Sequence, residues 1–217
     1  MKRIFSIVLT LLTIVATASA QSSFNNAAYA AATSGGSYKG FLEAGYLAGF
    51  GDYKANMLEI LTTHGAAFTP NFFIGAGLGA TVLFTKDNIT WWDKYPQGNH
   101  ESQPGTTAVM IPLYADLRYT FGNGGIQPFL ECKIGASLLV SSSYIAVGDR
   151  YIDDDASMYI SPTIGFRFPL GTKSAINLGV TYTLISQRLY YYNEYNFGVN
   201  DSGGIINAVG ARLQIEW

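Results

Sequence analysis

The residues best suited to catalysis lie in one polar segment, where His100, Glu101 and Ser102 follow one another. An imidazole base, a carboxylate that orients it and a hydroxyl nucleophile are the groups of a hydrolytic triad. Adjacent loop residues are not held in that geometry, so we favour a solvated loop. The second histidine, His64, shares a face with apolar residues and is interpreted as structural or interfacial. We therefore predict no catalytic site; an enzyme that uses His100, Glu101 or a nearby Ser is the alternative.

An acidic run, Asp153 to Asp155 with Asp149 nearby, offers carboxylate oxygens of the kind that a hard cation such as calcium binds. The run lacks the glycine and the ligand spacing of a known calcium loop, so a solvated loop is favoured. We predict no metal and no cofactor, and leave open whether these aspartates bind a cation.

Aromatic side chains gather in two other polar stretches. Tyr and Trp favour the membrane interface, where a ring meets headgroups and water together. The same rings could stack on a surface glycan or contact a protein ligand, and both interpretations stay open. The residues are Trp91, Trp92, Tyr95, Tyr190, Tyr191 and Tyr192.

The composition indicates an unusual solvent. Of 217 residues 48% are hydrophobic and only 13% charged, about half the charged fraction of soluble domains. A net charge of -2 gives no electrostatic footprint for nucleic acid. The single cysteine, Cys132, excludes a disulfide scaffold.

The first twenty residues have the pattern of a secretory signal peptide. A basic start is followed by an apolar run over residues 4–16 and by small residues at 18–20. That run is shorter than the ~20 residues of a spanning helix. We predict a cleaved signal at 1–20, a flexible periplasmic leader at 21–36 and a folded domain at 37–217.

The folded domain shows apolar residues at every second position in eight segments. Their length, 9 to 15 residues, exceeds that of strands in soluble proteins and suits tilted strands that cross a bilayer. The second segment is the least regular, and its register is left open. The segments are 37–50, 57–68, 72–84, 107–121, 126–138, 160–168, 176–184 and 209–217.

Short turns alternate with long connections. Residues 69–71, 122–125 and 171–174 are tight hairpin signals, and longer polar loops occupy 85–106, 141–156 and 186–203. This alternation is typical of an all-β, eight-stranded antiparallel transmembrane β-barrel with up-and-down topology. A soluble β-sandwich is the alternative, but its strands rarely run this long.

The charged residues decide which face is outside. With the apolar face of each segment turned outward, ten charged residues all fall on the opposite face: Lys39, Glu43, Glu59, Asp116, Arg118, Glu131, Lys133, Arg167, Arg212 and Glu216. Hydrocarbon would enforce this separation, because a lipid-facing Lys or Arg at the midplane costs ~2 to 4 kcal/mol.

An eight-stranded barrel has an interior that side chains can just fill. We expect small residues such as Gly79, Thr81, Ser137, Ser161 and Thr183 to line its upper half. In the lower half we predict an ion-paired plug of Glu43, Asp116, Arg118, Glu131, Lys133, Arg167 and Arg212. Whether the lumen conducts remains open.

Residues 38–41, 72–77, 111–119 and 128–131 resemble outer-membrane β-barrel domain proteins of the OmpA/OmpX type. The resemblance covers roughly residues 37–217 and implies a bacterial outer-membrane location, lipid as the surrounding partner and a monomer. Leu213, Ile215 and the terminal Trp217 look like the signal that the barrel-assembly machinery reads. We expect a non-enzymatic protein that serves envelope structure or surface contact through its long loops. The resemblance implies two alternatives: an outer-membrane enzyme that modifies lipid A or phospholipid through His100, Glu101 or a nearby Ser, and a narrow conduit for small amphipathic molecules.

Overall fold

In the described part of the chain, all regular structure is strand. The computed structural model describes residues 37–51, 54–84, 89–90, 102–103, 107–140, 146–147, 150–152, 156–171, 174–191 and 200–217. No helix within these ranges is long and apolar enough to cross a membrane. The predicted signal peptide and leader lie outside them.

Eight long strands form the body of the molecule, and four short strands lie in its connections. The long strands are β1 (Ser37–Phe50), β2 (Asn56–Ala67), β3 (Phe72–Phe84), β6 (Thr107–Thr120), β7 (Gln127–Leu139), β10 (Ser157–Pro169), β11 (Ala175–Tyr191) and β12 (Asn200–Glu216). The short ones are β4 (Ile89–Thr90), β5 (Ser102–Gln103), β8 (Ala146–Val147) and β9 (Arg150–Ile152).

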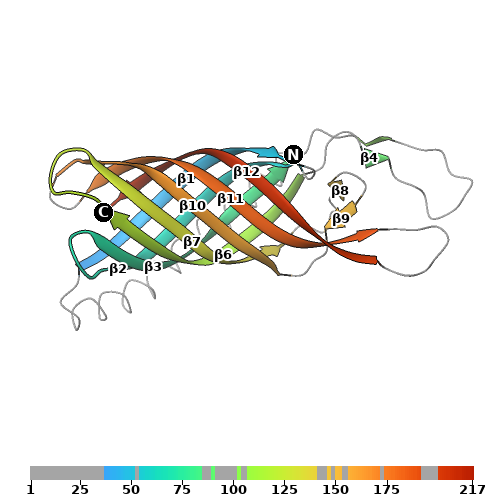
Figure 1. Cartoon of the computed structure of the whole chain (residues 1–217), viewed down its shortest axis with the longest axis horizontal. Helices are drawn as coiled ribbons and strands as arrows, with labels where there is room; N and C mark the ends of the chain where they lie inside the picture. Colours follow the sequence, from blue (N-terminus) through green and yellow to red (C-terminus); the bar gives the residue numbers. More distant parts are fainter. Residues whose placement is uncertain are drawn as a thin grey trace, which may run out of the picture.

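The long strands close into a barrel. Each pairs antiparallel with the next long strand in sequence, and β1 pairs with β12 to complete the cylinder. In Figure 1 the strands cross the long axis obliquely, and the C-terminus lies at the end that holds the short turns. The prediction of an eight-stranded up-and-down barrel is therefore confirmed.

Neighbouring residues along each strand face opposite sides of the wall. Leu42 is 47% exposed, whereas Glu43 beside it is 1% exposed. Eight of the ten charged side chains predicted to face inward are buried; the other two, Lys39 and Arg167, are partly exposed and pair with buried Glu216. The wall thus turns apolar side chains outward and closes around its ionised ones, the reverse of a soluble domain.

One expectation about the connections was wrong. Within the predicted loop 186–203, residues 186–191 and 200–203 are strand, because β11 continues to Tyr191 and pairs there with Asn200 at the start of β12. In Figure 1 this pair projects beyond the other long strands. There β11 also pairs on its other edge with β9, at Leu189 and Tyr190. The segment 57–68, whose register was open, forms β2, with Leu58 and Ile60 exposed and Glu59 buried.

The seam between β1 and β12 is fastened by the last residue. The backbone amides of Gly40 and Trp217 donate to each other's carbonyl oxygens, at 3.0 and 3.1 Å. A Cβ on Gly40 would lie 2.5 Å from a carbon of the Trp217 ring, so only glycine leaves room for the indole. The His64 ring stands edge-on to Trp217, and its nitrogens lie 2.6 Å from Tyr38 Oη and 2.9 Å from Thr62 Oγ1.

We predict that Gly40→Leu weakens this seam, because its side chain and the Trp217 ring claim the same space. The free energy of unfolding, from urea titration of the barrel in detergent micelles, should fall by about 1 to 3 kcal/mol. Ala44→Leu, at an exposed position of the same strand, is the control and should change little. Trp217→Ala in the Gly40→Leu background should recover part of the loss; no recovery would contradict the account.

Candidate functional site

The hairpin of β6 and β7 sets charges of opposite sign directly across from each other. Asp116 is the register partner of Lys133, and Arg118 is the partner of Glu131. Because side chains alternate across a strand, positions 116 and 118 face inward together, as do 131 and 133. Two acids and two bases therefore meet inside the barrel as a direct result of strand register.

Glu43 from β1 joins this group across the lumen. Lys133 Nζ lies 3.0 Å from Glu43 Oε2 and 3.5 Å from Asp116 Oδ2, and it also contacts Glu131. Arg118 Nη2 lies 3.1 Å from Glu131 Oε2 and 3.2 Å from Asp116 Oδ2. Each of these two bases thus bridges several carboxylates.

The Arg118 guanidinium also has an aromatic floor. Its central carbon lies 3.7 Å from the centroid of the Phe41 ring, toward the short-turn side. A cation over a ring face is attracted by the ring quadrupole, more strongly where water is excluded. Phe41 thus both supports the guanidinium and fills the barrel below it.

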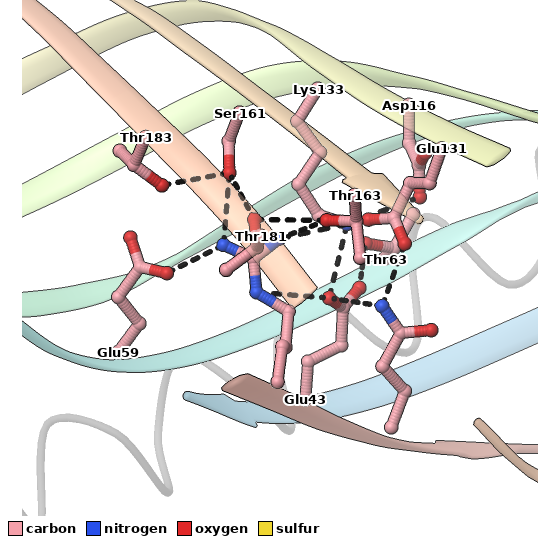
Figure 2. Close-up of polar contacts among 12 residues, drawn as sticks. Glu43, Glu59, Thr63, Asp116, Glu131, Lys133, Ser161, Thr163, Thr181 and Thr183 are labelled. Atoms are coloured by element: carbon pink, nitrogen blue, oxygen red, sulfur yellow. Dashed lines mark hydrogen bonds and ion pairs between the residues drawn. The ribbon is translucent and has the colours of Figure 1, made fainter. Parts of the chain in front are cut away.

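Arg212 extends the network toward the middle of the barrel. Its Nη2 atom lies 2.5 Å from Glu59 Oε2 and donates to Ser161 Oγ at 3.0 Å, while Nη1 donates to Thr163 Oγ1 at 3.3 Å. The Ser161 hydroxyl in turn hydrogen-bonds with Thr181 Oγ1 at 3.1 Å and Thr183 Oγ1 at 2.9 Å, and Figure 2 shows these hydroxyls close together. The hydroxyls satisfy donors that a single carboxylate leaves unpaired.

Arg167 lies apart from the six other members of the predicted plug. Its Nε donates to Glu216 Oε2 at 2.7 Å and its Nη1 to Gln127 Oε1 at 2.7 Å. Lys39 Nζ reaches the same Glu216 carboxylate at 2.7 Å. The side chains of Lys39 and Arg167 are 25% and 17% exposed, so this second group forms the rim at the short-turn end.

The two groups balance each other in formal charge. We call the first group the central group; it holds four carboxylates and three bases, namely Glu43, Glu59, Asp116, Glu131, Arg118, Lys133 and Arg212. The rim holds one carboxylate, Glu216, and two bases, Lys39 and Arg167. Across all ten side chains the sum is zero. Burying an unpaired ion costs several kcal/mol even after the protein relaxes, so this balance is a condition for closing the cylinder.

Sequence reasoning left several members of the network out of the plug. Glu59 was placed on the inward face but not in the plug, because it lies near the long-loop end of its strand and the plug took only charges in the lower half. Gln214 donates to Glu131 Oε2 at 2.6 Å and to Glu43 Oε2 at 3.2 Å, and accepts from Arg118. It occupies an inward position two residues from Arg212, so the period-two rule could have identified it. Tyr159, whose hydroxyl donates to Glu59, shares the inward set of Ser161 and Thr163 but lies just before the predicted segment 160–168.

The upper half of the lumen differs from the expectation. The small residues predicted there are present, with Thr81, Ser137, Ser161 and Thr183 buried, but large apolar side chains share the level. The register rows run Leu47, Met57, Leu83, Ala108 on one side and Tyr159, Ile185, Ile206 on the other. All are essentially inaccessible. We call this cluster the apolar layer.

The apolar layer was missed for a physical reason. Near the long-loop end both strand faces are apolar, as at Leu83 with Phe84 and Ile205 with Ile206. The period-two pattern assigns the more regular apolar face of each strand to the outside. On the opposite face only the charged residues were considered. The prediction of small residues in the upper half therefore left out the large apolar side chains that share it.

The central group also contains the described residues that best match a metal-binding arrangement. Oxygens of Glu43, Asp116 and Glu131 lie within 4.8 Å of one another. Lys133 and Arg118 each contact all three carboxylates. The protein's own cations thus occupy the place that a metal would take, and the arrangement neutralises charge.

Most residues singled out for chemistry at the long-loop end lie outside the described residues. These are Trp91, Trp92, Tyr95, His100, Glu101, Asp149, Asp153 to Asp155 and Tyr192. Ser102 lies on β5, paired with Thr90. Tyr190 and Tyr191 are on β11, not in a loop. At the other end Leu213, Ile215 and Trp217 are exposed on the outer wall.

The fold and the lumen define a closed eight-stranded barrel with an ion-paired interior. No protein-family model matches the chain, and no curated protein matches it. Similar solved structures include Neisserial surface protein A (10% identity, TM-score 0.48, covering 82% of this chain and 95% of that one).

Two further solved structures are similar to this barrel. They are the outer membrane enzyme PagL (11% identity, TM-score 0.47, 80% of this chain and 97% of that one) and the outer membrane protein OprG from Pseudomonas aeruginosa (12% identity, TM-score 0.44, 82% and 96%). At such values they assign no activity to this chain.

We predict that Lys133→Met destabilises the barrel by about 3 to 5 kcal/mol, the cost of leaving buried carboxylates uncompensated. The measurement is the free energy of unfolding from urea titration in detergent micelles. Lys39→Met is the control: its ammonium is partly exposed and Glu216 keeps Arg167, so the loss should stay below about 1 kcal/mol. Equal losses in the two variants would contradict the network.

We predict that the apolar layer stabilises the barrel as a packed core does. Leu61 is buried in the same apolar cluster as the layer. Leu61→Ala should lower the free energy of unfolding by about 2 to 5 kcal/mol because it leaves a cavity. Leu58→Ala is the control on the outward face of the same strand and should cost less in the same titration. A larger loss at Leu58 would show that the upper lumen is not packed.

Proposed function

We propose that the chain is an integral protein of the bacterial outer membrane with a sealed lumen and no enzymatic activity. It would serve envelope structure or surface contact through the connections at its long-loop end. The observation that carries the proposal is the combination of an apolar outer wall with a lumen filled at two levels.

The outer wall supports the membrane location. Large apolar side chains are exposed on every long strand, among them Leu42, Ile60, Leu117 and Ile164. Water would penalise such a continuous surface, whereas hydrocarbon requires it. The strands of 12 to 17 residues exceed the ~9 to 11 residues that a tilted strand needs to cross a bilayer. In barrels of this kind the short turns lie on the periplasmic side.

The interior supports a seal. An ion moving along the axis would meet the central group, whose charges are already paired, and then the apolar layer, where side chains such as Leu47, Met57 and Ile206 are fully buried. Crossing either level requires side chains to separate, since eight strands leave an interior that side chains fill. This filling favours a structural role over a conduit for small amphipathic molecules.

The ends of the chain support export and assembly as part of the same proposal. Residues 1–20 would direct secretion and be removed. Leu213, Ile215 and Trp217 lie outward at the end of the last strand, where the barrel-assembly machinery could read them before the seam closes. A glycan or protein ligand would meet the connections that carry Trp91 and Tyr192. The barrel would act as a monomer.

We predict that the purified protein gives no steady conductance in planar lipid bilayers, because both levels of the lumen are closed. The measurement is single-channel current at moderate voltage, after heat-modifiable gel migration has shown that the sample is folded. Steady nanosiemens-scale openings from folded protein would contradict the seal and favour the conduit. Failure of the folded protein to insert into lipid vesicles would contradict the membrane location itself.

A further inference from the structure

A shallow groove of about 560 Å³ crosses the outer wall of the barrel, a size typical of small-molecule sites. Two register rows of outward side chains line it. One row runs through Tyr119, Leu130 and Ile164. The other runs through Leu117, Cys132 and Pro162. The groove therefore follows the hydrogen-bonding direction and climbs obliquely around the wall.

The second row is low at its centre. Cys132 and Pro162 are register partners and are the smallest and the most compact side chains of that row. The long apolar side chains Leu117 and Leu130 flank them, and Ile164 and Val180 stand 61% and 58% exposed beside them. A depression bordered by protruding side chains is the result.

The wall is also irregular behind this depression. The pairing of β10 with β11 holds at Ile160 with Leu184 and again at Thr163 with Thr181, but is interrupted between them, at Ser161 and Pro162. Proline has no amide hydrogen to donate. The Thr181 hydroxyl donates to the Pro162 carbonyl oxygen at 3.2 Å instead. A side-chain hydrogen bond thus replaces part of the ladder and keeps Pro162 in the wall.

We propose that this groove binds one acyl chain of a phospholipid from the leaflet on the short-turn side of the membrane. The inference rests on the membrane location proposed above. The groove starts at Phe72 and Tyr119, beside the short turns, and reaches Tyr182 and Val209 near the middle of the barrel. A lipid anchored at the short-turn interface can lay its tail along this path.

The chemistry of the surroundings selects this occupant. The side chains that face outward in the groove are apolar or aromatic, with the Tyr119 hydroxyl at its lower end. The exposed wall continues past it without an outward charge among the ten charged strand residues. At this depth an acyl chain meets the groove over its whole length, and burial of its methylenes supplies the affinity.

The test is native mass spectrometry of the full folded barrel transferred from phosphatidylethanolamine vesicles into a mild detergent. The wild-type protein should retain one phospholipid. Cys132→Trp fills the low centre of the groove and should reduce the retained fraction about tenfold or more. Ile134→Trp, at an exposed position two residues further along β7 and outside the groove, is the matched control and should retain lipid as the wild type does.

Several results would overturn the proposal. These are equal retention of lipid by Cys132→Trp and wild type, an equal loss of lipid in Ile134→Trp, or a barrel that carries a second copy of itself in place of lipid.

If Cys132→Trp fails to fold, the wild-type barrel with a phospholipid that bears a photoreactive group on its acyl chain decides the question. Crosslinks should concentrate on β7 and β10; an even spread over all eight long strands would exclude the groove. Protein that never enters the vesicles would instead refute the membrane location.

Discussion

The whole structure depends on one constraint, which is that ionised side chains must be paired once a cylinder closes around them. The central group meets it by sharing: Lys133 and Arg118 each bridge three carboxylates, and the Gln214 amide donates to two of the same carboxylates, Glu43 and Glu131. Each missing partner would leave a charge without water or counterion. The strand register, the tilt and the inward glycines all serve this packing.

Space inside the barrel is distributed by the same strands that supply the charges. Gly45 lies opposite Arg212 across the seam, and a Cβ there would approach the Arg212 side chain at 3.6 Å. Gly77 sits against the Tyr114 ring, where a Cβ would lie 2.5 Å from a ring carbon. Tyr114 in turn packs over Lys133, with 5.4 Å from its ring centroid to Nζ. Small and large side chains alternate around the lumen so that neither level is left hollow.

The sequence predicted the barrel well because its outer wall is uniform. Hydrocarbon accepts almost any apolar side chain, so the period-two pattern from Tyr38 to Phe50 or from Thr107 to Phe121 stays clear of exceptions. The lumen is specific and gave a weaker signal. Asp116, Arg118, Glu131 and Lys133 could be assigned from their spacing around a short turn, since a hairpin fixes its register. The pairing of Glu59 with Arg212, 153 positions apart, depends on how the whole cylinder closes.

The apolar layer marks the limit of pattern reading. Where both faces of a strand are apolar, alternation assigns an outside and says nothing about what fills the inside. The long-loop end carries such a stretch on several strands at once, and only the closed barrel brings Leu47, Met57 and Ile206 to one level. In the same way the groove over Cys132 and Pro162 arises from two strands whose small side chains coincide in register.

The most direct test of the account is the accessibility of spin labels placed one at a time along β1 in lipid vesicles, in a Cys132→Ala background. Labels at positions 42, 44 and 46 should collide with oxygen dissolved in the hydrocarbon, and labels at 43, 45 and 47 should be shielded both from oxygen and from a water-soluble nickel complex. If labels at 42, 44 and 46 collided freely with the nickel complex, the apolar face would not be turned to lipid. If labels at 43, 45 and 47 collided freely with it, the lumen would be open to water and the barrel would not be sealed.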